Sequence, residues 1–192
     1  MATKTNSGMA NYAKAQIGKP YWFGTYGQKG SRALYLAKKK QYPKYYKASD
    51  FPSQYGKRVH DCAGLIKGYL WSKTPTSTPK YNKNQDYGAN GFYTHAKSKG
   101  KISSFKKVKG QLVFKGTDKR KTHVGVYIGG GYVVEAKGHK YGVVKSKLSG
   151  WKYWAQCNLI KPDAKKTTAK PKTTASSTAT ATTTESSTTP TT

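Results

Sequence analysis

The sequence contains very few acidic residues. Only 7 Asp and Glu stand against 36 Lys and Arg in 192 residues, which gives a formal net charge of +29 at pH 7. Such an excess predicts a positively charged surface whose natural partner is a polyanion. Nucleic acid and the anionic polymers of a bacterial wall both fit, and the 16 tyrosines suit stacking on bases and on sugar rings alike. The charge therefore leaves both partners open.

Cysteine is also scarce, because Cys62 and Cys157 are the only two in the chain. Two cysteines exclude a disulfide framework for a domain of this size, although a single bridge between them stays open. Cys157 lies in "YWAQCNLI", a predicted terminal strand, which favours a buried and inert thiol. No close set of His and Cys ligands is present, so neither a metal nor another cofactor is expected.

Long apolar runs are missing. The first twenty residues lack the continuous apolar segment of a secretory signal. No stretch reaches the length that a helix needs to cross a bilayer. We therefore expect a chain that is synthesised in the cytoplasm without a signal peptide and without a membrane span. If its target lies beyond the membrane, another route must release it.

The composition changes after residue 160. From residue 163 to residue 192, 17 of the 30 residues are Thr or Ser, and none is aromatic or a large aliphatic. Such a segment buries too little apolar surface to offset the entropy of ordering. The sequence thus predicts one domain over residues 1–160 and a disordered tail or linker over 161–192.

Within residues 1–160 the first half has helical spacing and the second half has short runs rich in β-branched residues. A first helix is expected to have Asn6 or Ser7 as its N-cap and to be ended by Gly18 and Pro20. This order predicts an α+β fold in which N-terminal helices pack on a C-terminal antiparallel sheet. Further helices are expected over 31–40, 62–71 and 91–100, and strands over 110–116, 122–128, 132–138, 141–147 and 153–160.

Cys62 opens the predicted helix "CAGLIKGYLW", with Asp61 at its N-cap. At this position the helix dipole and the unpaired backbone N–H groups favour the thiolate over the thiol. A lone cysteine at such a place is nevertheless more often structural. The catalytic interpretation therefore requires a base.

Four histidines are candidates for that base. His60 precedes the helix in an extended segment and is expected to point away from Cys62 into solvent. His95 is expected on an exposed, lysine-rich helix face, and His139 in a turn that could line a substrate cleft. His123 differs because it begins a strand of a well-marked hairpin.

The hairpin around residues 129–131 fixes which side chains share a face. A two-residue loop would bury Glu135 among valines at a cost of several kcal/mol. A three-residue loop puts Ile128 opposite Tyr132 and makes His123 and Glu135 diagonal neighbours. Glu135 would then fix one nitrogen of His123, leaving the other for the thiol, and Gly125 would keep the space beside them open. The alternative is an exposed pair worth a few tenths of a kcal/mol.

Several segments together resemble a known family. "HDCAGLIKGYL" and "THVGVYIGGGYVVEA" are similar to the two signature segments of the NlpC family of cell-wall cysteine peptidases, papain-like enzymes also called the p-sixty domain. "GKPYWFGTYGQ" resembles its N-terminal motif and "KGQLVFKG" its strand before the histidine. The resemblance covers roughly residues 8–160 in the family's order and implies a papain-like NlpC fold.

The resemblance implies that Cys62 is the nucleophile, His123 the base and Glu135 the orienting residue, a position where the family usually has His or a neutral polar residue. Tyr21 and Asp61 are assigned to oxyanion and substrate binding, with Tyr21 helping the backbone N–H of Cys62.

The implied activity is hydrolysis of peptidoglycan stem peptides, by a γ-D-glutamyl-diamino-acid endopeptidase or by an N-acetylmuramoyl-L-alanine amidase. We expect a monomer that binds peptidoglycan and anionic wall polymers, with nucleic acid bound only non-specifically. A phage-type lysin, released through a holin or carried by a virion, fits these features. The non-enzymatic alternative is a basic polyanion-binding protein in which Cys62 is merely buried.

Overall fold

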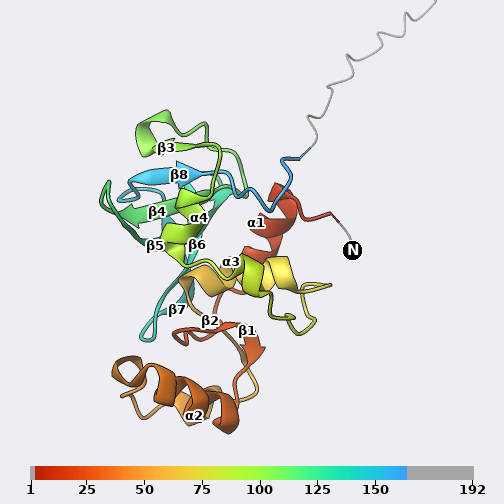
Figure 1. Ribbon diagram of the computed structural model, residues 1–192, viewed down its shortest axis with the longest axis vertical. Helices are drawn as coiled ribbons and strands as arrows, with labels where there is room; N and C mark the ends of the chain where they lie inside the picture. Colours follow the sequence, from red (N-terminus) through yellow and green to blue (C-terminus); the bar gives the residue numbers. More distant parts are fainter. Residues whose placement is uncertain (1–2, 164–192) are drawn as a thin grey trace, which may run out of the picture.

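The computed structural model describes residues 3–163, and the predicted tail lies outside the described residues from 164 onward. Within this part the chain forms four α-helices, eight β-strands and four short 3-10 helices (Figure 1). The α-helices are α1 (Asn6–Ala15), α2 (Arg32–Gln41), α3 (Cys62–Trp71) and α4 (Ala89–Thr94). The 3-10 helices are η1 (Pro43–Tyr45), η2 (Phe51–Gln54), η3 (Lys83–Gln85) and η4 (Ile102–Ser104).

A six-stranded antiparallel sheet forms the C-terminal half, with the strand order β3-β8-β4-β5-β6-β7. Its centre is the predicted series of hairpins, while β8 returns from the end of the domain to lie between β3 and β4. The strands are β3 (Lys99–Lys101), β4 (Leu112–Gly116), β5 (Lys121–Gly129), β6 (Tyr132–Gly138), β7 (Gly142–Lys147) and β8 (Tyr153–Ala155).

Helices α1, α3 and α4 pack on one face of this sheet (Figure 1). Apolar residues at alternate positions of the strands, such as Val124 and Val126 of β5, meet Met9 of α1 and Leu65 of α3 there. All four side chains are fully buried. This layer is the main core and confirms the predicted packing of helices on an antiparallel sheet.

The opposite face of the sheet carries a smaller apolar cluster. Val113, Tyr127 and Val133 point to this side and are covered by Phe105 and Trp151. Trp151 comes from the segment between β7 and β8. The residues that alternate with the main core are therefore also shielded from water, and a polar group placed among them has to find its partners within the protein.

The segment between β1 (Tyr26–Lys29) and β2 (Arg58–His60) forms a separate lobe beside α3, at the lower end of Figure 1. The two strands pair with each other as a two-stranded sheet. Helix α2 buries none of its residues, so the aromatic cluster beneath it comes mainly from outside the helix. The fully buried members of that cluster are Trp22, Tyr46, Phe51 and Val59.

Several predicted boundaries are wrong. The N-cap of α1 is Thr5, whose side chain accepts from the N–H of Gly8, and not Asn6 or Ser7. The helix expected over 91–100 ends at Thr94, because Gly100 lies in β3 and pairs with β8. The terminal strand expected over 153–160 stops at Ala155. For the helix expected over 91–100, pairing with a distant strand sets the boundary.

Both cysteines are free, so the possible bridge between Cys62 and Cys157 is absent. Cys157 is almost completely buried in the main core, as predicted. Among residues 3–163, no helix combines the length and the apolar character that crossing a membrane requires.

Candidate active site

Cys62 is the first residue of α3, and Asp61 is its N-cap, as predicted. One carboxylate oxygen of Asp61 accepts from the N–H of Gly64 at 2.5 Å, and the other accepts from the N–H of Gly24 at 2.8 Å. A Cβ on Gly64 would lie 1.8 Å from the carbonyl oxygen of Thr25. Glycine at this position therefore lets the start of α3 approach the backbone just before Tyr26, which fixes the place of Cys62.

The Cys62 side chain is partly exposed and packs against the main core. Burial and the negative charge of Asp61 raise the pKa of its thiol to about 12, although backbone N–H groups of Val124 and Ala63 act in the opposite direction. The predicted preference for the thiolate is therefore wrong. The backbone N–H groups at the helix start do lower the pKa of the thiol, but desolvation raises it by more. A group that removes the proton is needed before the sulfur can react.

Strands β5 and β6 pair in the predicted register, with Val126 opposite Val134. The turn itself differs from the prediction. Gly129 pairs with Tyr132, so the loop has two residues and Ile128 occupies an irregularity in the ladder. A two-residue loop alone would shift the pairing of the two strands by one residue. The extra residue Ile128 forms a β-bulge that cancels this shift, so the predicted register is kept. Gly130 and Gly131 supply the positive φ angles that the tight turn requires, 62° and 81°.

The predicted contact between His123 and Glu135 is confirmed, with Nε2 of His123 2.6 Å from Oε2 of Glu135. The Glu135 side chain is only 1% exposed and the His123 side chain 19%. Ser146 of β7 donates to the other carboxylate oxygen at 2.6 Å, and the ammonium group of Lys115 lies 3.6 Å from Oε2. Glu135 is therefore a buried carboxylate with three polar neighbours, not an exposed surface acid.

These neighbours decide the charge of Glu135 and the tautomer of His123. Burial alone would raise the pKa of Glu135, but hydrogen bonds from His123 and Ser146, together with the charge of Lys115, lower it to about 2. An ionised carboxylate only accepts, so Nε2 of His123 carries the hydrogen in this contact. In the neutral imidazole, Nδ1 then holds the lone pair and is the basic nitrogen.

Gly125 does not leave an open space beside these residues as expected. A Cβ at this position would lie 2.6 Å from Cγ1 of Val133 and 2.7 Å from Cη2 of Trp151. The indole of Trp151 occupies the space and stacks on His123, with ring centroids 5.6 Å apart and an interplanar angle of 24°. The absence of a side chain on Gly125 is therefore what admits the tryptophan.

Sequence reasoning missed Trp151, Ser146 and Lys115. Ser146 pairs with Val133 and is thus diagonal to Glu135, the same relation that His123 has across the other ladder. The short turn before β7 was a usable signal for it. Nothing in the local pattern indicated Trp151, which reaches the site from the segment after β7.

Tyr21 lies close to Cys62 and Asp61, since both of them affect its phenol. Burial, followed by the negative charges of Asp61 and of the Cys62 thiolate, raises the pKa of its phenol well above the usual range. The phenol therefore keeps its proton and stays a hydrogen-bond donor. The structure thus brings Tyr21, Asp61 and Cys62 close to one another. The Cys62 sulfur faces the backbone N–H of Val124, the residue that follows His123.

The other histidines follow the predictions in part. His60 is fully buried, not solvated as expected, because its side chain lies among Gln16 of α1 and Gly64 of α3; its imidazole lies 3.3 Å from Gln16 and 3.4 Å from the carbonyl of Gly64. Burial lowers the pKa of His60 to about 3. His95 is exposed, as predicted. His139 is partly exposed and lies 2.6 Å from Asp50.

Within residues 3–163, no three His, Cys, Asp or Glu side chains gather in a way that could hold a metal ion.

The structure thus combines a cysteine at the start of a helix that packs on an antiparallel sheet with a strand histidine that contacts a carboxylate on the next strand. The family model of the NlpC/P60 family matches residues 18–160. The chain belongs to the NlpC/P60 family.

Solved structures with a similar fold include the NlpC/p60 domain of the peptidoglycan hydrolase SagA, with 18% identity and a TM-score of 0.47 over 79% of this chain and 98% of that domain. The P60 domain of the antigen MAP1204 from M. avium subspecies paratuberculosis has 18% identity and a TM-score of 0.49, over 81% of this chain and 95% of that one. The peptidoglycan hydrolase RipB from Mycobacterium tuberculosis has 21% identity and a TM-score of 0.48, over 81% of this chain and 65% of its own. No curated protein sequence matches the chain significantly.

Proposed function

We propose that this protein is a cysteine peptidase that hydrolyses amide bonds in the stem peptides of peptidoglycan. The observation that carries the proposal is the 2.6 Å contact between His123 and the buried, ionised Glu135, on the strand whose backbone faces the Cys62 sulfur. Membership of the NlpC/P60 family supports the substrate class. An exposed ion pair of structural origin would not require a buried carboxylate with a second donor in Ser146.

In the proposed reaction, Nδ1 of His123 takes the proton of the Cys62 thiol as the sulfur attacks the peptide carbonyl carbon. The thiol pKa of about 12 makes this base necessary. The developing oxyanion accepts hydrogen bonds from the backbone N–H of Cys62 and from the Tyr21 phenol. His123 then gives its proton to the leaving amine, and the C–N bond breaks to leave a thioester.

Water completes the cycle. His123 removes a proton from the water as its oxygen attacks the thioester carbonyl, and the proton returns to the departing Cys62 sulfur. Glu135 stays ionised throughout and stabilises the imidazolium that forms in each half of the reaction. Asp61 contributes by capping the helix that holds Cys62, and by lining the same side of the site as Tyr21.

For the bond that is cut, we propose the one between D-glutamate and the diamino acid, as in a γ-D-glutamyl-diamino-acid endopeptidase. Cleavage at N-acetylmuramoyl-L-alanine, as by an amidase, is the second candidate. The biological role that we propose is that of a phage-type lysin, acting as a monomer on the wall after release from the cell or from a virion. The excess of 29 positive charges supports retention on an anionic wall, with binding that weakens as salt is added.

The test is a turbidity assay on purified peptidoglycan with the wild type, Cys62→Ala and the matched control Cys157→Ala, followed by chemical identification of the newly freed amine. We expect loss of clearing only for Cys62→Ala, with wall binding retained. Equal clearing by Cys62→Ala and the wild type would remove Cys62 from the mechanism. A freed amine on the diamino acid supports the endopeptidase, and one on L-alanine supports the amidase.

The non-catalytic alternative is a basic protein that only binds polyanions, which the charge alone would explain. It predicts tight binding to walls or to duplex DNA with no new amine from any muropeptide. Such a result with correctly folded wild type would overturn the proposed peptidase.

A further inference from the structure

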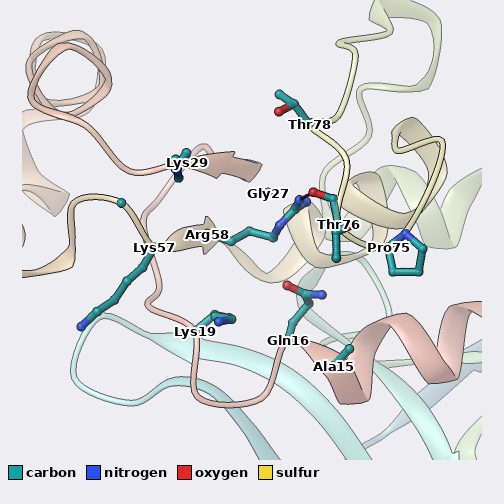
Figure 2. Close-up of a pocket in the computed structure, with 11 residues that line it drawn as sticks. Ala15, Gln16, Lys19, Gly27, Lys29, Lys57, Arg58, Pro75, Thr76 and Thr78 are labelled. Carbon is teal, nitrogen blue, oxygen red and sulfur yellow. Dashed lines mark hydrogen bonds between the residues drawn. The ribbon is translucent and has the colours of Figure 1, made fainter.

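A hollow of about 610 Å³ lies outside the candidate active site, between the end of α1, the two-stranded sheet and the loop before Lys80 (Figure 2). Its size is within the range of pockets that bind small ligands or single units of a polymer. We call it the basic pocket. Its lining residues are Ala15, Gln16, Lys19, Gly27, Lys29, Gly56, Lys57, Arg58, Pro75, Thr76 and Thr78.

Four of these residues are cations, and none is an acid. Lys19, Lys29 and Lys57 come from separate segments of the chain, and Figure 2 shows Lys29 and Lys19 on either side of Arg58. None of the four forms an ion pair within the described part of the chain. Figure 2 shows the Lys57 side chain extending away from the other three cations. The charges of Lys19, Lys29 and Arg58 beside a hollow without a counter-charge repel one another, and a bound anion would relieve that repulsion.

Arg58 is held in place by the backbone of the neighbouring loop. Its Nη2 donates to the carbonyl oxygens of Thr76 and Ser77 at 2.6 and 2.9 Å. Its Nη1 is buried, and the side-chain neighbour that interacts with it among residues 3–163 is the neutral hydroxyl of Tyr12. The guanidinium is thus oriented by neutral acceptors that leave its charge uncompensated, which is a favourable preparation for binding an anion.

His60 lies next to the pocket, on the other side of Gly27, and its pKa responds to the pocket's positive charges. A Cβ on Gly27 would lie 2.9 Å from Cε1 of His60 and 3.2 Å from Nη1 of Arg58, so the pocket wall has no room for a side chain here. After burial, the charges of Arg58 and Lys19 contribute to the low pKa of His60. His60 is therefore a natural sensor for an anion that neutralises these two residues.

We propose that the basic pocket binds the phosphate groups of a linear polyol phosphate polymer. The lining contains no aromatic ring, so it offers no platform for stacking the bases of single-stranded nucleic acid. Thr76 and Thr78 instead place hydroxyl-bearing side chains beside the cations, which suits a chain of hydroxyl groups and phosphodiesters. That the polymer belongs to a bacterial wall rests on the proposed function, whereas the phosphate site does not.

Binding of purified poly(glycerol phosphate) to the full chain tests this site. The pocket variant is Lys19→Gln with Lys29→Gln, and the matched control is Lys97→Gln with Lys106→Gln, two exposed lysines outside the pocket lining with the same loss of charge. We expect the pocket variant to bind roughly tenfold more weakly or worse, and its plot of log affinity against log salt to lose about one to two units of slope. The control should change by less than about threefold. An equal loss in both variants would overturn the site.

Nuclear magnetic resonance of the His60 imidazole provides a second readout. Inorganic phosphate should shift the His60 signal in the wild type and in the control, and should leave it unmoved in the pocket variant. Poly-glutamate and single-stranded DNA are compared as competitors. If either competes as well as poly(glycerol phosphate) at equal charge, the assignment to polyol phosphate is wrong.

Cleavage of a short soluble muropeptide separates this proposal from the proposed function. Neither Lys19 nor Lys29 belongs to the candidate active site, so the pocket variant should cleave the muropeptide at the wild-type rate. Loss of cleavage in the pocket variant would contradict a site that is independent of the chemistry. A wild type that cleaves nothing but still binds the polymer through the pocket would overturn the peptidase and leave the phosphate site standing.

Discussion

His60 and His123 occupy two regions that flank the same cysteine and have opposite environments. His60 is two residues from Cys62 in sequence, but it is fully buried between α1 and α3, without a carboxylate partner, and its pKa falls to about 3. His123 is 61 residues away, partly exposed, and tied to an ionised glutamate. A group with a pKa near 3 is a poor proton acceptor at neutral pH. The partner on the next strand, and not closeness in sequence, distinguishes the candidate base.

The largest expected effect breaks this comparison directly. His123→Ala should reduce the rate of amide hydrolysis by about 10³-fold or more, because His123 is the base of the proposed reaction. His95→Ala, on an exposed surface, should leave the rate within about twofold. Rates on a soluble muropeptide at pH 7 measure both. A His123→Ala enzyme with more than a tenth of the wild-type rate would remove this residue as the base.

The next effect concerns stability and belongs to His60. Its pKa is lower in the folded chain, about 3, than the usual 6.5, so the unfolded chain binds a proton first as the pH falls. Its contribution to stability is complete above pH 6.5 and is lost between 6.5 and 3, by on the order of 4 kcal/mol. His60→Gln should flatten this part of the profile, measured by urea unfolding at several pH values. An unchanged pH profile would show that His60 is not buried in its neutral form.

The contact between Trp151 and His123 is tested at Gly125. Gly125→Ala places a methyl group against the Trp151 indole and should lower the free energy of unfolding by about 1–3 kcal/mol. The control is Gly88→Ala, where a new Cβ meets nothing within 4 Å and φ is −80°. Because Gly88 is the N-cap of α4, that change should cost no more than about 1 kcal/mol. Equal stability of the two variants in chemical unfolding would contradict the tight packing beside His123.

The smallest expected effect concerns the hydrogen bond from Ser146 to Glu135. Ser146→Ala removes one of the hydrogen bonds that keep the pKa of Glu135 low, and should cost about 1 kcal/mol of stability at pH 7. The loss should disappear on acidification toward pH 2, as Glu135 becomes protonated in the wild type as well. Ser149→Ala, at an exposed position, is the control. A Ser146→Ala cost that does not depend on pH would point to packing instead of charge.

The sequence predicts those parts of the site that depend on neighbours along the chain or across one hairpin. Asp61 caps the helix of Cys62 because both lie in one turn, and Glu135 meets His123 because a slip of one residue would put a carboxylate among valines. The α3 helix and the β5–β7 strands follow from the same local signals.

Features that need a distant segment escaped prediction. His60 is buried because α1 and β1, far from it in sequence, close over β2, and Trp151 reaches His123 from beyond β7. The basic pocket collects its lysines from segments with no common pattern. The raised pKa of Cys62 likewise reflects desolvation by the assembled core, which no helix position reveals.

Strand β2 is only three residues long, and it joins Arg58 at one end to Asp61 and Cys62 just past the other. Since an extended chain advances by at most about 3.4 Å per residue, the α-carbons of Arg58 and Cys62 are no more than about 14 Å apart. A phosphate bound at Arg58 would therefore hold its polymer close to the Cys62 sulfur. Binding and cleavage would then take place at the same position on the wall. Each peptide bond would be cut next to the phosphate polymer to which the protein is bound.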